Sequence, residues 1–218
     1  TPTLSSAASD VYKRQPSSPF VQKISSLGIP IISEIEFAYH YCNSKKICVT
    51  GSNGKTTTTL LITHLLNNAG FSAKAVGNVG ESYAMSVAID PPDYQVIELS
   101  SFQLDFMFSF KADIALLLNI TPDHLDRYQN SFDLYVNSKF RITQNMTVND
   151  HFIYNYDDPV IKEALAKRNL ECQTHPVSIF QKDGVDSWLD KESIIIKINN
   201  QKQTIMSIHQ LAQQGKHN

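Results

Sequence analysis

Cysteine is scarce in this sequence, and long apolar runs are missing. The three cysteines are Cys42, Cys48 and Cys172. An odd number without metal-binding spacing forms no even disulfide set, which is typical of a reducing compartment. No apolar run approaches the roughly 20 residues that span a bilayer, and the first residues lack the layout of a secretory signal. We therefore expect a cytoplasmic protein with no membrane partner.

Positive charge is not in excess either. The chain has 19 Lys and Arg against 21 Asp and Glu, a formal net charge of -2. A protein that holds a nucleic-acid backbone needs a basic patch, so we expect no nucleic-acid partner. The 218 residues, 42% of them hydrophobic, suffice for one globular domain with a full core.

Residues 1–15, TPTLSSAASDVYKRQ, are polar and show no strand or helix pattern. We predict that they are a non-native scar or a natural disordered tail. From residue 46 onward the pattern is that of a folded domain.

Short apolar stretches at residues 47–50, 96–99 and 114–118 alternate with stretches of helical periodicity. This alternation predicts an α/β fold with a mostly parallel sheet and helices on both faces. Residues 115–118 are all apolar, which favours a central strand covered on both sides. Residues 177–207 have the pattern of short strands and polar turns, so we expect a small β-rich extension near the C-terminal end, at the edge of the sheet.

Three helices are marked by their ends. Residues 55–69 are followed by Gly70 as a C-cap, and residues 132–145 form a second periodic stretch. The third helix begins with Asp158 as N-cap and Pro159 at its first position.

The strongest chemical motif is TGSNGKTT at residues 50–57, between a predicted strand and a predicted helix. Glycines let the backbone aim N–H groups at phosphate oxygens, and the helix N-terminus adds positive potential. The motif has the form GxxGKTT, because Val49 stands where the longer GxxxxGK[ST] pattern needs glycine. An ordinary glycine-rich turn explains the adjacent Lys-Thr-Thr less well. The predicted phosphate-binding residues are Gly51, Ser52, Asn53, Gly54, Lys55, Thr56 and Thr57, with Thr56 as a Mg²⁺ ligand.

Polar residues also follow the next two strands, where open α/β sheets bind ligands. Glu98 ends an apolar stretch and can hold Mg²⁺ through oxygen, although a glutamate there is also commonly solvated or a helix cap. His124, in NITPDHLDR at residues 119–127, is either a metal ligand or a structural hydrogen-bonding residue. The residue pattern leaves both readings open.

Five motifs in order resemble the Mur ligase family: GSNGKTT at 51–57, GNVG at 77–80, ELSSFQL at 98–104, NITPDHLDRY at 119–128 and SFDLYVNSKFRI at 131–142. The resemblance runs from about residue 17 to Asn218. ELSSFQL resembles the family member that adds D-glutamate.

The resemblance implies roles for single residues. Lys55 is similar to the phosphate-loop lysine, and Thr56 with Glu98 to the ligands of a first Mg²⁺. His124 resembles the ligand of a second Mg²⁺, and Lys139 the lysine that the family carbamylates. A carbamate turns a cationic amine into an anionic oxygen donor, which suits Mg²⁺.

Four further residues gain a role only from the resemblance. Asn78 and Ser100, together with His124, correspond to contacts with the nucleotide-sugar substrate. His217 and Asn218 correspond to the start of the segment that holds adenine.

The implied activity is that of an ADP-forming carboxylate–amine ligase of peptidoglycan precursor synthesis. It uses ATP and two Mg²⁺ to join D-glutamate to UDP-N-acetylmuramoyl-L-alanine through an acyl phosphate, with Lys55, Lys139 and His124 as catalytic residues. We expect a monomer.

By the same resemblance, residues 16–45 are the end of a UDP-binding N-terminal domain and a linker, and 46–218 are a truncated central ATP-binding domain without the C-terminal domain. The alternatives are another Mur-type or folylpolyglutamate-type amide ligase, and a non-catalytic ATP-binding fragment. A phosphate-loop GTPase or kinase is weaker, because no guanine-reading motif is present in the sequence.

Overall fold

A computed structural model describes residues 19–198 and 201–210. Its α-helices are α2 (Pro19–Ser26), α3 (Glu34–Tyr39), α4 (Lys55–Asn68), α5 (Tyr83–Ile89), α6 (Ser101–Asp105), α7 (Phe132–Phe140) and α8 (Pro159–Ala166). Short 3-10 helices are η1 (Leu125–Tyr128), η2 (Arg141–Thr143) and η3 (Ile208–Gln210). Within the described ranges, no helix combines the length and the hydropathy of a membrane span.

The strands are β1 (Lys45–Thr50), β2 (Ala73–Gly77), β3 (Tyr94–Glu98), β4 (Ile114–Leu117), β5 (His151–Asn155), β6 (Gln173–Ser178), β7 (Ser187–Asp190), β8 (Ser193–Ile198) and β9 (Gln201–Ser207). They form one sheet in the order β2-β3-β1-β4-β5-β6-β7-β8-β9. The pairs from β2 to β7 are parallel, whereas β7-β8 and β8-β9 are antiparallel. The predicted α/β class and the β-rich edge extension are therefore confirmed.

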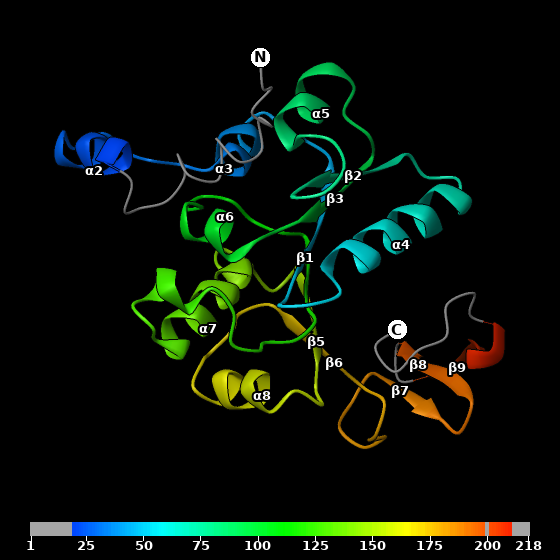
Figure 1. Ribbon diagram of the computed structural model, residues 1–218. Helices are drawn as coiled ribbons and strands as arrows, with labels where there is room; N and C mark the ends of the chain where they lie inside the picture. Colours follow the sequence, from blue (N-terminus) through cyan, green and yellow to red (C-terminus); the bar gives the residue numbers. More distant parts are fainter. Residues whose placement is uncertain (1–18, 199–200, 211–218) are drawn as a thin grey trace, which may run out of the picture.

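Helices lie on both faces of the sheet, but unequally. The connection from β1 to β2 runs in one direction along the sheet, and the later connections up to β6 run in the other. Right-handed crossovers then put α4 on one face and the helices from α5 to α8 on the opposite face. Figure 1 shows this division, with α6, α7 and α8 on the side of the strands away from α4.

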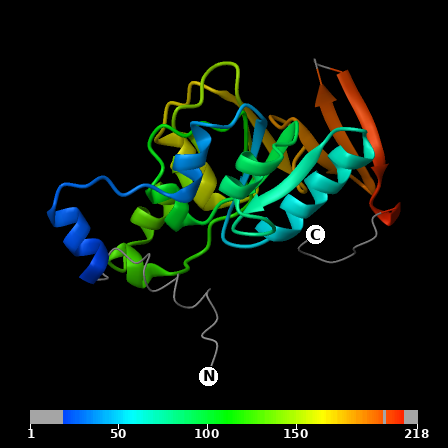
Figure 2. The same cartoon turned by 90° about the horizontal axis from the view of Figure 1, so that it is seen from above.

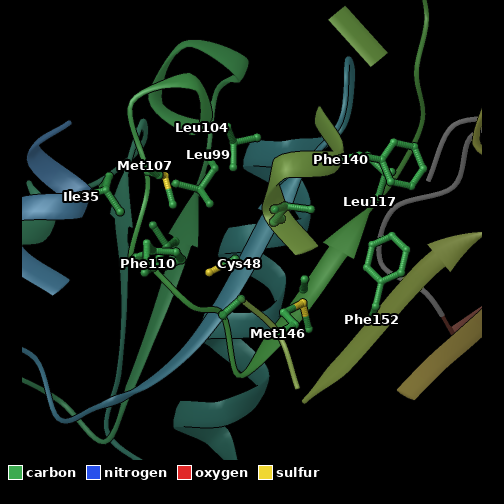
Figure 3. Packing of buried hydrophobic residues seen from close by; sticks show 14 of the residues in the cluster. Ile35, Cys48, Leu99, Leu104, Met107, Phe110, Leu117, Phe140, Met146 and Phe152 are labelled. Atoms are coloured by element: carbon green, nitrogen blue, oxygen red, sulfur yellow. The ribbon is translucent and has the colours of Figure 1, made fainter. Parts of the chain in front are cut away.

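The core lies between the sheet and the helices α5 to α8 that cover one of its faces. Its fully buried side chains include Leu99, Leu104, Met107 and Phe152. Figure 3 shows the first three near Cys48 and Phe110, and Phe152 beside Phe140. Helix α3 belongs to the same core, because Ile35 is 0% exposed and packs with it. In both Figure 1 and Figure 2, α2 and β9 lie at opposite ends of the molecule.

Two of the three predicted helix ends are confirmed, and one is not. Helix α4 ends at Asn68 and Gly70 follows with a φ of 88°, as a C-terminal glycine should. Asp158 accepts hydrogen bonds from the amides of Val160 and Ile161, so the N-cap prediction is confirmed. Helix α7 is shorter than predicted. It ends at Phe140 and continues as η2. Asn145 then turns to a φ of 62°, and its side-chain amide donates hydrogen bonds to the backbone carbonyls of Phe108 and Phe110, which ends the helical region.

The prediction that residues 115–118 are covered on both sides is wrong for this structure. Ala115 and Leu117 are buried, but Leu116 and Leu118 are half-exposed. The reason is that α4 lies mainly over β1, β2 and β3. The predicted tail at residues 1–15 lies outside the described residues.

Candidate functional site

The predicted phosphate loop joins β1 to α4 at the carboxyl edge of the sheet. Gly51 begins it against β4, where an added Cβ would lie 3.1 Å from Leu118 Cβ and 3.3 Å from the amide nitrogen of Asn119. A larger residue would therefore push the loop away from β4. Helix α4 begins with its first amides at the end of this loop, which is the arrangement that binds phosphate.

Asn119, directly after β4, holds the loop in place. Its carbonyl accepts from the Ser52 amide (2.9 Å), and its side chain both accepts from the Asn53 amide (2.8 Å) and donates to the Asn53 carbonyl (3.0 Å). The sequence motifs alone predict no role for Asn119. Its position at the end of a strand next to β1 was the available signal.

Two lysines from distant segments converge on this loop. Lys55 Nζ donates to the carbonyl oxygens of Gly51 (2.9 Å) and Ser52 (2.8 Å). Lys139 Nζ, from α7, donates to the same Gly51 oxygen at 2.8 Å. The amino groups of both lysines therefore meet at the start of the loop.

Lys139 is the unusual member of the pair, because its side chain is 2% exposed. Burial is the main cause and the nearby charge of Lys55 the second, and together they lower the pKa of Lys139 to about 7. At neutral pH a large share of this amine is then unprotonated, which an ordinary lysine is not. A neutral amine is the form that reacts with carbon dioxide.

Tyr135 supports both the loop and Lys139. It lies one turn before Lys139 on α7, its ring centroid is 5.2 Å from Nζ, and its hydroxyl lies 3.1 Å from Ser52 Oγ. In the sequence, Tyr135 is noted only as part of the motif at residues 131–142. The i to i+4 spacing from Lys139 was the signal that placed it on the same face.

Glu98 joins two of the other predicted residues. Its Oε2 accepts from Thr56 Oγ1 at 2.7 Å, and its Oε1 accepts from Asn78 Nδ2 at 2.8 Å. Gly77 makes this possible. It has a φ of 98°, and an added Cβ would lie 2.5 Å from the Glu98 carbonyl oxygen. The strand ends of β2 and β3 thus approach closely and bring Asn78 to Glu98.

The donor set at this point fits Mg²⁺. A threonine hydroxyl and a carboxylate are hard oxygen ligands, and Glu98 is 2% exposed. Within the described residues no group of three or more His, Cys, Asp or Glu side chains gathers to hold a metal ion. Mg²⁺ here would take its other ligands from phosphate oxygens and water, as it commonly does.

His124 and Ser100 are placed less tightly. The His124 side chain is 54% exposed, its Nε2 lies 3.5 Å from Asp123 Oδ2, and its ring packs near Phe102. Ser100 caps α6, where its hydroxyl donates to Gln103 Oε1 at 2.9 Å and accepts from the Gln103 amide. Thr57 is exposed on α4. His217 and Asn218 lie outside the described residues.

One cleft of about 590 Å³ brings most of these side chains together. Among the residues predicted from sequence, its lining includes Lys55, Asn78, Ser100, His124 and Lys139. Residues that were not predicted complete the lining, among them Phe102, Asp123, Arg127 and Tyr135. The arrangement combines a phosphate loop, two lysines and a metal-compatible carboxylate, which suits phosphoryl transfer to a substrate in the cleft.

The fold and the site are those of a nucleotide-binding α/β domain with a phosphate loop, and a protein family with such a domain matches this sequence. The family described as the Mur ligase middle domain matches residues 49–218. The chain therefore belongs to the Mur ligase family.

Its curated relatives are more specific. The chain is 48% identical over 200 residues to the "UDP-N-acetylmuramoylalanine--D-glutamate ligase" of Bacteroides fragilis, covering 92% of this chain and 45% of the relative. It is 38% identical to the protein of the same name from Fusobacterium nucleatum, covering 93% of this chain and 46% of that one. The chain thus spans about half the length of the curated relatives that it matches.

Solved structures share the fold at lower identity. A UDP-N-acetylmuramoyl-L-alanyl-D-glutamate--2,6-diaminopimelate ligase matches with a TM-score of 0.58 and 18% identity, covering 89% of this chain and 43% of that chain. E. coli FolC in complex with DHPP and ADP matches with a TM-score of 0.53 and 13% identity, covering 87% and 57%. Both similarities concern the fold alone.

Proposed function

We propose that this chain is the ATP-binding catalytic part of a cytoplasmic, monomeric ligase that joins D-glutamate to UDP-N-acetylmuramoyl-L-alanine. The observation that carries the proposal is the meeting of Lys55 and Lys139 at Gly51, beside the pair formed by Thr56 and Glu98. The name of the Bacteroides fragilis relative supports the choice of substrates.

The reaction has two steps. An oxygen of the L-alanine carboxylate attacks the γ-phosphorus of ATP, and the bond to the β-phosphate oxygen breaks, which releases ADP. The amine of D-glutamate then attacks the acyl carbon, phosphate leaves with the electrons of the C–O bond, and the nitrogen loses a proton. Neither step requires a covalent bond to the protein, so the site needs positioning and charge neutralisation.

The residues divide this work. The loop amides and Lys55 bind the β- and γ-phosphates, and Asn119 keeps the loop in its binding shape. Thr56 and Glu98 would hold Mg²⁺, and the ion would supply positive charge to neutralise the transferred group. Asn78 orients Glu98 through its side-chain amide. Asn78, Ser100 and His124 face the nucleotide-sugar substrate in the cleft.

Lys139 has a second assignment in the proposal. Its unprotonated Nζ attacks carbon dioxide, a C–N bond forms, and a proton leaves to solvent, which gives an anionic carbamate. The carbamate oxygens and His124 would then hold a second Mg²⁺ near the incoming carboxylate. The lowered pKa of Lys139 supports this step.

The test is phosphate release by the full-length enzyme with ATP, Mg²⁺ and UDP-N-acetylmuramoyl-L-alanine. Release should require D-glutamate, and L-glutamate should not replace it. Lys55→Ala should lower turnover by about 100-fold or more, because the γ-phosphate loses its cation. Lys45→Ala is the matched control, since Lys45 begins β1 at the opposite edge with its side chain 68% exposed. Release that ignores D-glutamate would contradict the substrate assignment, and full activity of Lys55→Ala would contradict the phosphate-loop assignment.

A folylpolyglutamate-type ligase is the second candidate, because E. coli FolC shares the fold. The same assay separates the two. Phosphate release with a folate and L-glutamate, but not with D-glutamate, would favour this second candidate.

A further inference from the structure

His124 lies at the start of a helical turn that has little stability of its own. Helix η1 is a single 3-10 turn of four residues, and its N-cap His124 makes no side-chain capping hydrogen bond. His124, Gln129 and Asn130 flank this turn with φ values of 50°, 55° and 56°. Residues with a side chain rarely adopt this left-handed region, and it persists where the surroundings enforce it. Contacts with other elements must therefore hold η1, and His124 with it.

Tyr128, the last residue of η1, makes contacts of this kind. Its hydroxyl donates to Asp105 Oδ2 at 2.9 Å and lies 3.1 Å from Ser138 Oγ. Ser138 Oγ in turn donates to the Ser101 carbonyl at 3.0 Å. Tyr128, Ser101 and Ser138 are 7%, 2% and 3% exposed, so these hydrogen bonds lie in the interior, where leaving a polar group unpaired is costly. We call Ser101, Asp105, Tyr128 and Ser138 the tyrosine network.

The tyrosine network connects the two residues that the proposed function assigns to a second Mg²⁺. His124 is the N-cap of η1, and Lys139 directly follows Ser138 on α7. Helix α6 supplies the other two members of the network, at its first and last positions. Without the network, η1 and α7 could shift relative to α6 and to each other.

The network acts from behind the site. Of its four members, all of them in the described part of the chain, only Ser101 lines the cleft. Asp105, Tyr128 and Ser138 can therefore influence a substrate there only through the residues that they hold. A phenylalanine at position 128 would fill nearly the same space, so packing does not require the hydroxyl. Its hydrogen bonds instead select one arrangement of the three elements.

We propose that Tyr128 is a positioning residue whose hydroxyl sets the spacing between His124 and Lys139 by tying η1 to α6 and α7. The inference rests on the proposed function, in which these two side chains would hold one ion near the incoming carboxylate. A displacement of about 1 Å can lower turnover by about 100-fold when groups must be aligned for reaction. Loss of the hydroxyl should therefore affect turnover more than nucleotide binding, which depends on the phosphate loop.

Steady-state kinetics of the full-length enzyme test the proposal with Tyr128→Phe. We expect kcat to fall by about 10-fold, with the KM for ATP changed by less than about twofold. Tyr83→Phe is the matched control, because Tyr83 is 0% exposed but begins α5, a described helix that contributes no residue to the cleft lining. Its kcat should equal that of the parent. A KM for ATP that rises as much as kcat falls, or an equal loss in Tyr83→Phe, would overturn the proposal.

A double-mutant cycle shows whether Tyr128 acts through Lys139. A positioning residue has nothing left to position once its target is removed. In a Lys139→Ala background, Tyr128→Phe should therefore lower kcat by less than about twofold. An undiminished loss in that background would indicate a general structural role and would overturn the proposal.

Carbon-13 NMR with labelled bicarbonate and Mg²⁺ gives a readout that does not depend on turnover. A carbamate on Lys139 gains stability from an ion that it shares with His124, so a displaced Lys139 should carry less of it. The carbamate signal that Lys139→Ala removes should be weaker by about threefold in Tyr128→Phe and unchanged in Tyr83→Phe. An equal signal in Tyr128→Phe and the parent would contradict the positioning role. The D-glutamate dependence of phosphate release by the parent tests the proposed function separately.

Discussion

Strands β3 and β4 are similar in sequence but not in environment. Val96 and Ile97 lead into the polar site residue Glu98, and the apolar residues 115–118 lead into Asn119. Val96 and Ile97 are each 0% exposed, whereas Leu116 is half-exposed beside the buried Leu117. The difference shows that an apolar strand indicates a place inside the sheet, but does not say how many of its faces are covered.

The largest expected effect is a contrast within β5. Phe152→Ala should destabilise the chain by about 3–5 kcal/mol, because Phe152 is 0% exposed and leaves a cavity. Ile153→Ala, on the half-exposed face of β5, should destabilise the chain by only about 1 kcal/mol, because its side chain already contacts solvent. On β3, Val96→Ala and Ile97→Ala should lower the free energy of unfolding by similar amounts to each other. Urea unfolding of the four variants measures these changes. Equal losses of stability in the Phe152 and Ile153 variants would mean that both faces of β5 are buried.

A smaller loss of stability is expected where α3 packs against the covered part of the sheet. Glu36 is 3% exposed and accepts hydrogen bonds from the amides of Phe108 (2.9 Å), Ser109 (2.7 Å) and Phe110 (3.0 Å). Burial alone would raise the pKa of Glu36, but these hydrogen bonds outweigh it and hold the pKa below its ordinary value. Glu36→Gln should therefore cost about 2 kcal/mol at pH 7.

The sign of the pH dependence follows from that shift. Because the folded pKa of Glu36 is lowered, its contribution is fully present above the unfolded value of 4.5 and is lost as pH falls through the folded pKa. Unfolding free energies of the parent and Glu36→Gln should accordingly converge between pH 5 and the acid limit of folding. A constant difference down to pH 3, or Glu34→Gln behaving in the same way, would contradict this role.

The smallest expected effect concerns Lys139. Its folded pKa of about 7 lies below the ordinary 10.5, so the unmodified folded chain resists charging this amine. The resulting cost is complete below pH 7 and shrinks as pH rises toward 10.5, because the unfolded chain then holds the extra proton. Lys139→Met should stabilise the chain by on the order of 1 kcal/mol at pH 6 and by less at pH 9.

Thermal unfolding with and without added bicarbonate measures the Lys139 effect. Lys111→Met is the control, since hydrogen bonding to Asp150 raises the pKa of Lys111 and its loss should destabilise the chain. A Lys139→Met variant that is less stable than the parent at pH 6 would contradict a net cost of burying this charge.

Local order in the sequence predicted much of the fold. The alternation of apolar strands and helices, the Gly70 and Asp158 helix ends, and the phosphate loop all depend on neighbouring residues, and the structure has each of them. The end of α7 could not be predicted in the same way. Asn145 ends that region through bonds to Phe108 and Phe110, which lie more than 30 residues away.

In the site, too, local motifs identified residues but not the contacts between distant segments. Local motifs identified Lys55, Thr56 and Glu98 as candidates, and the family resemblance added Lys139. The contacts of Asn119 with the loop, of Asn78 with Glu98 and of Tyr135 with Ser52 were not predicted. Each joins segments at least 20 residues apart, which no local pattern encodes.

The sequence by itself therefore determined the fold class, the family and the candidate residues, since periodicity and motifs are written in consecutive positions. Only the tertiary structure decided that Lys139 is buried beside Lys55, with a pKa of about 7. It also decided that one apolar face of β4 and β5 stays half-exposed. Burial depends on what packs across a chain in space, and crossovers and strand order set that packing.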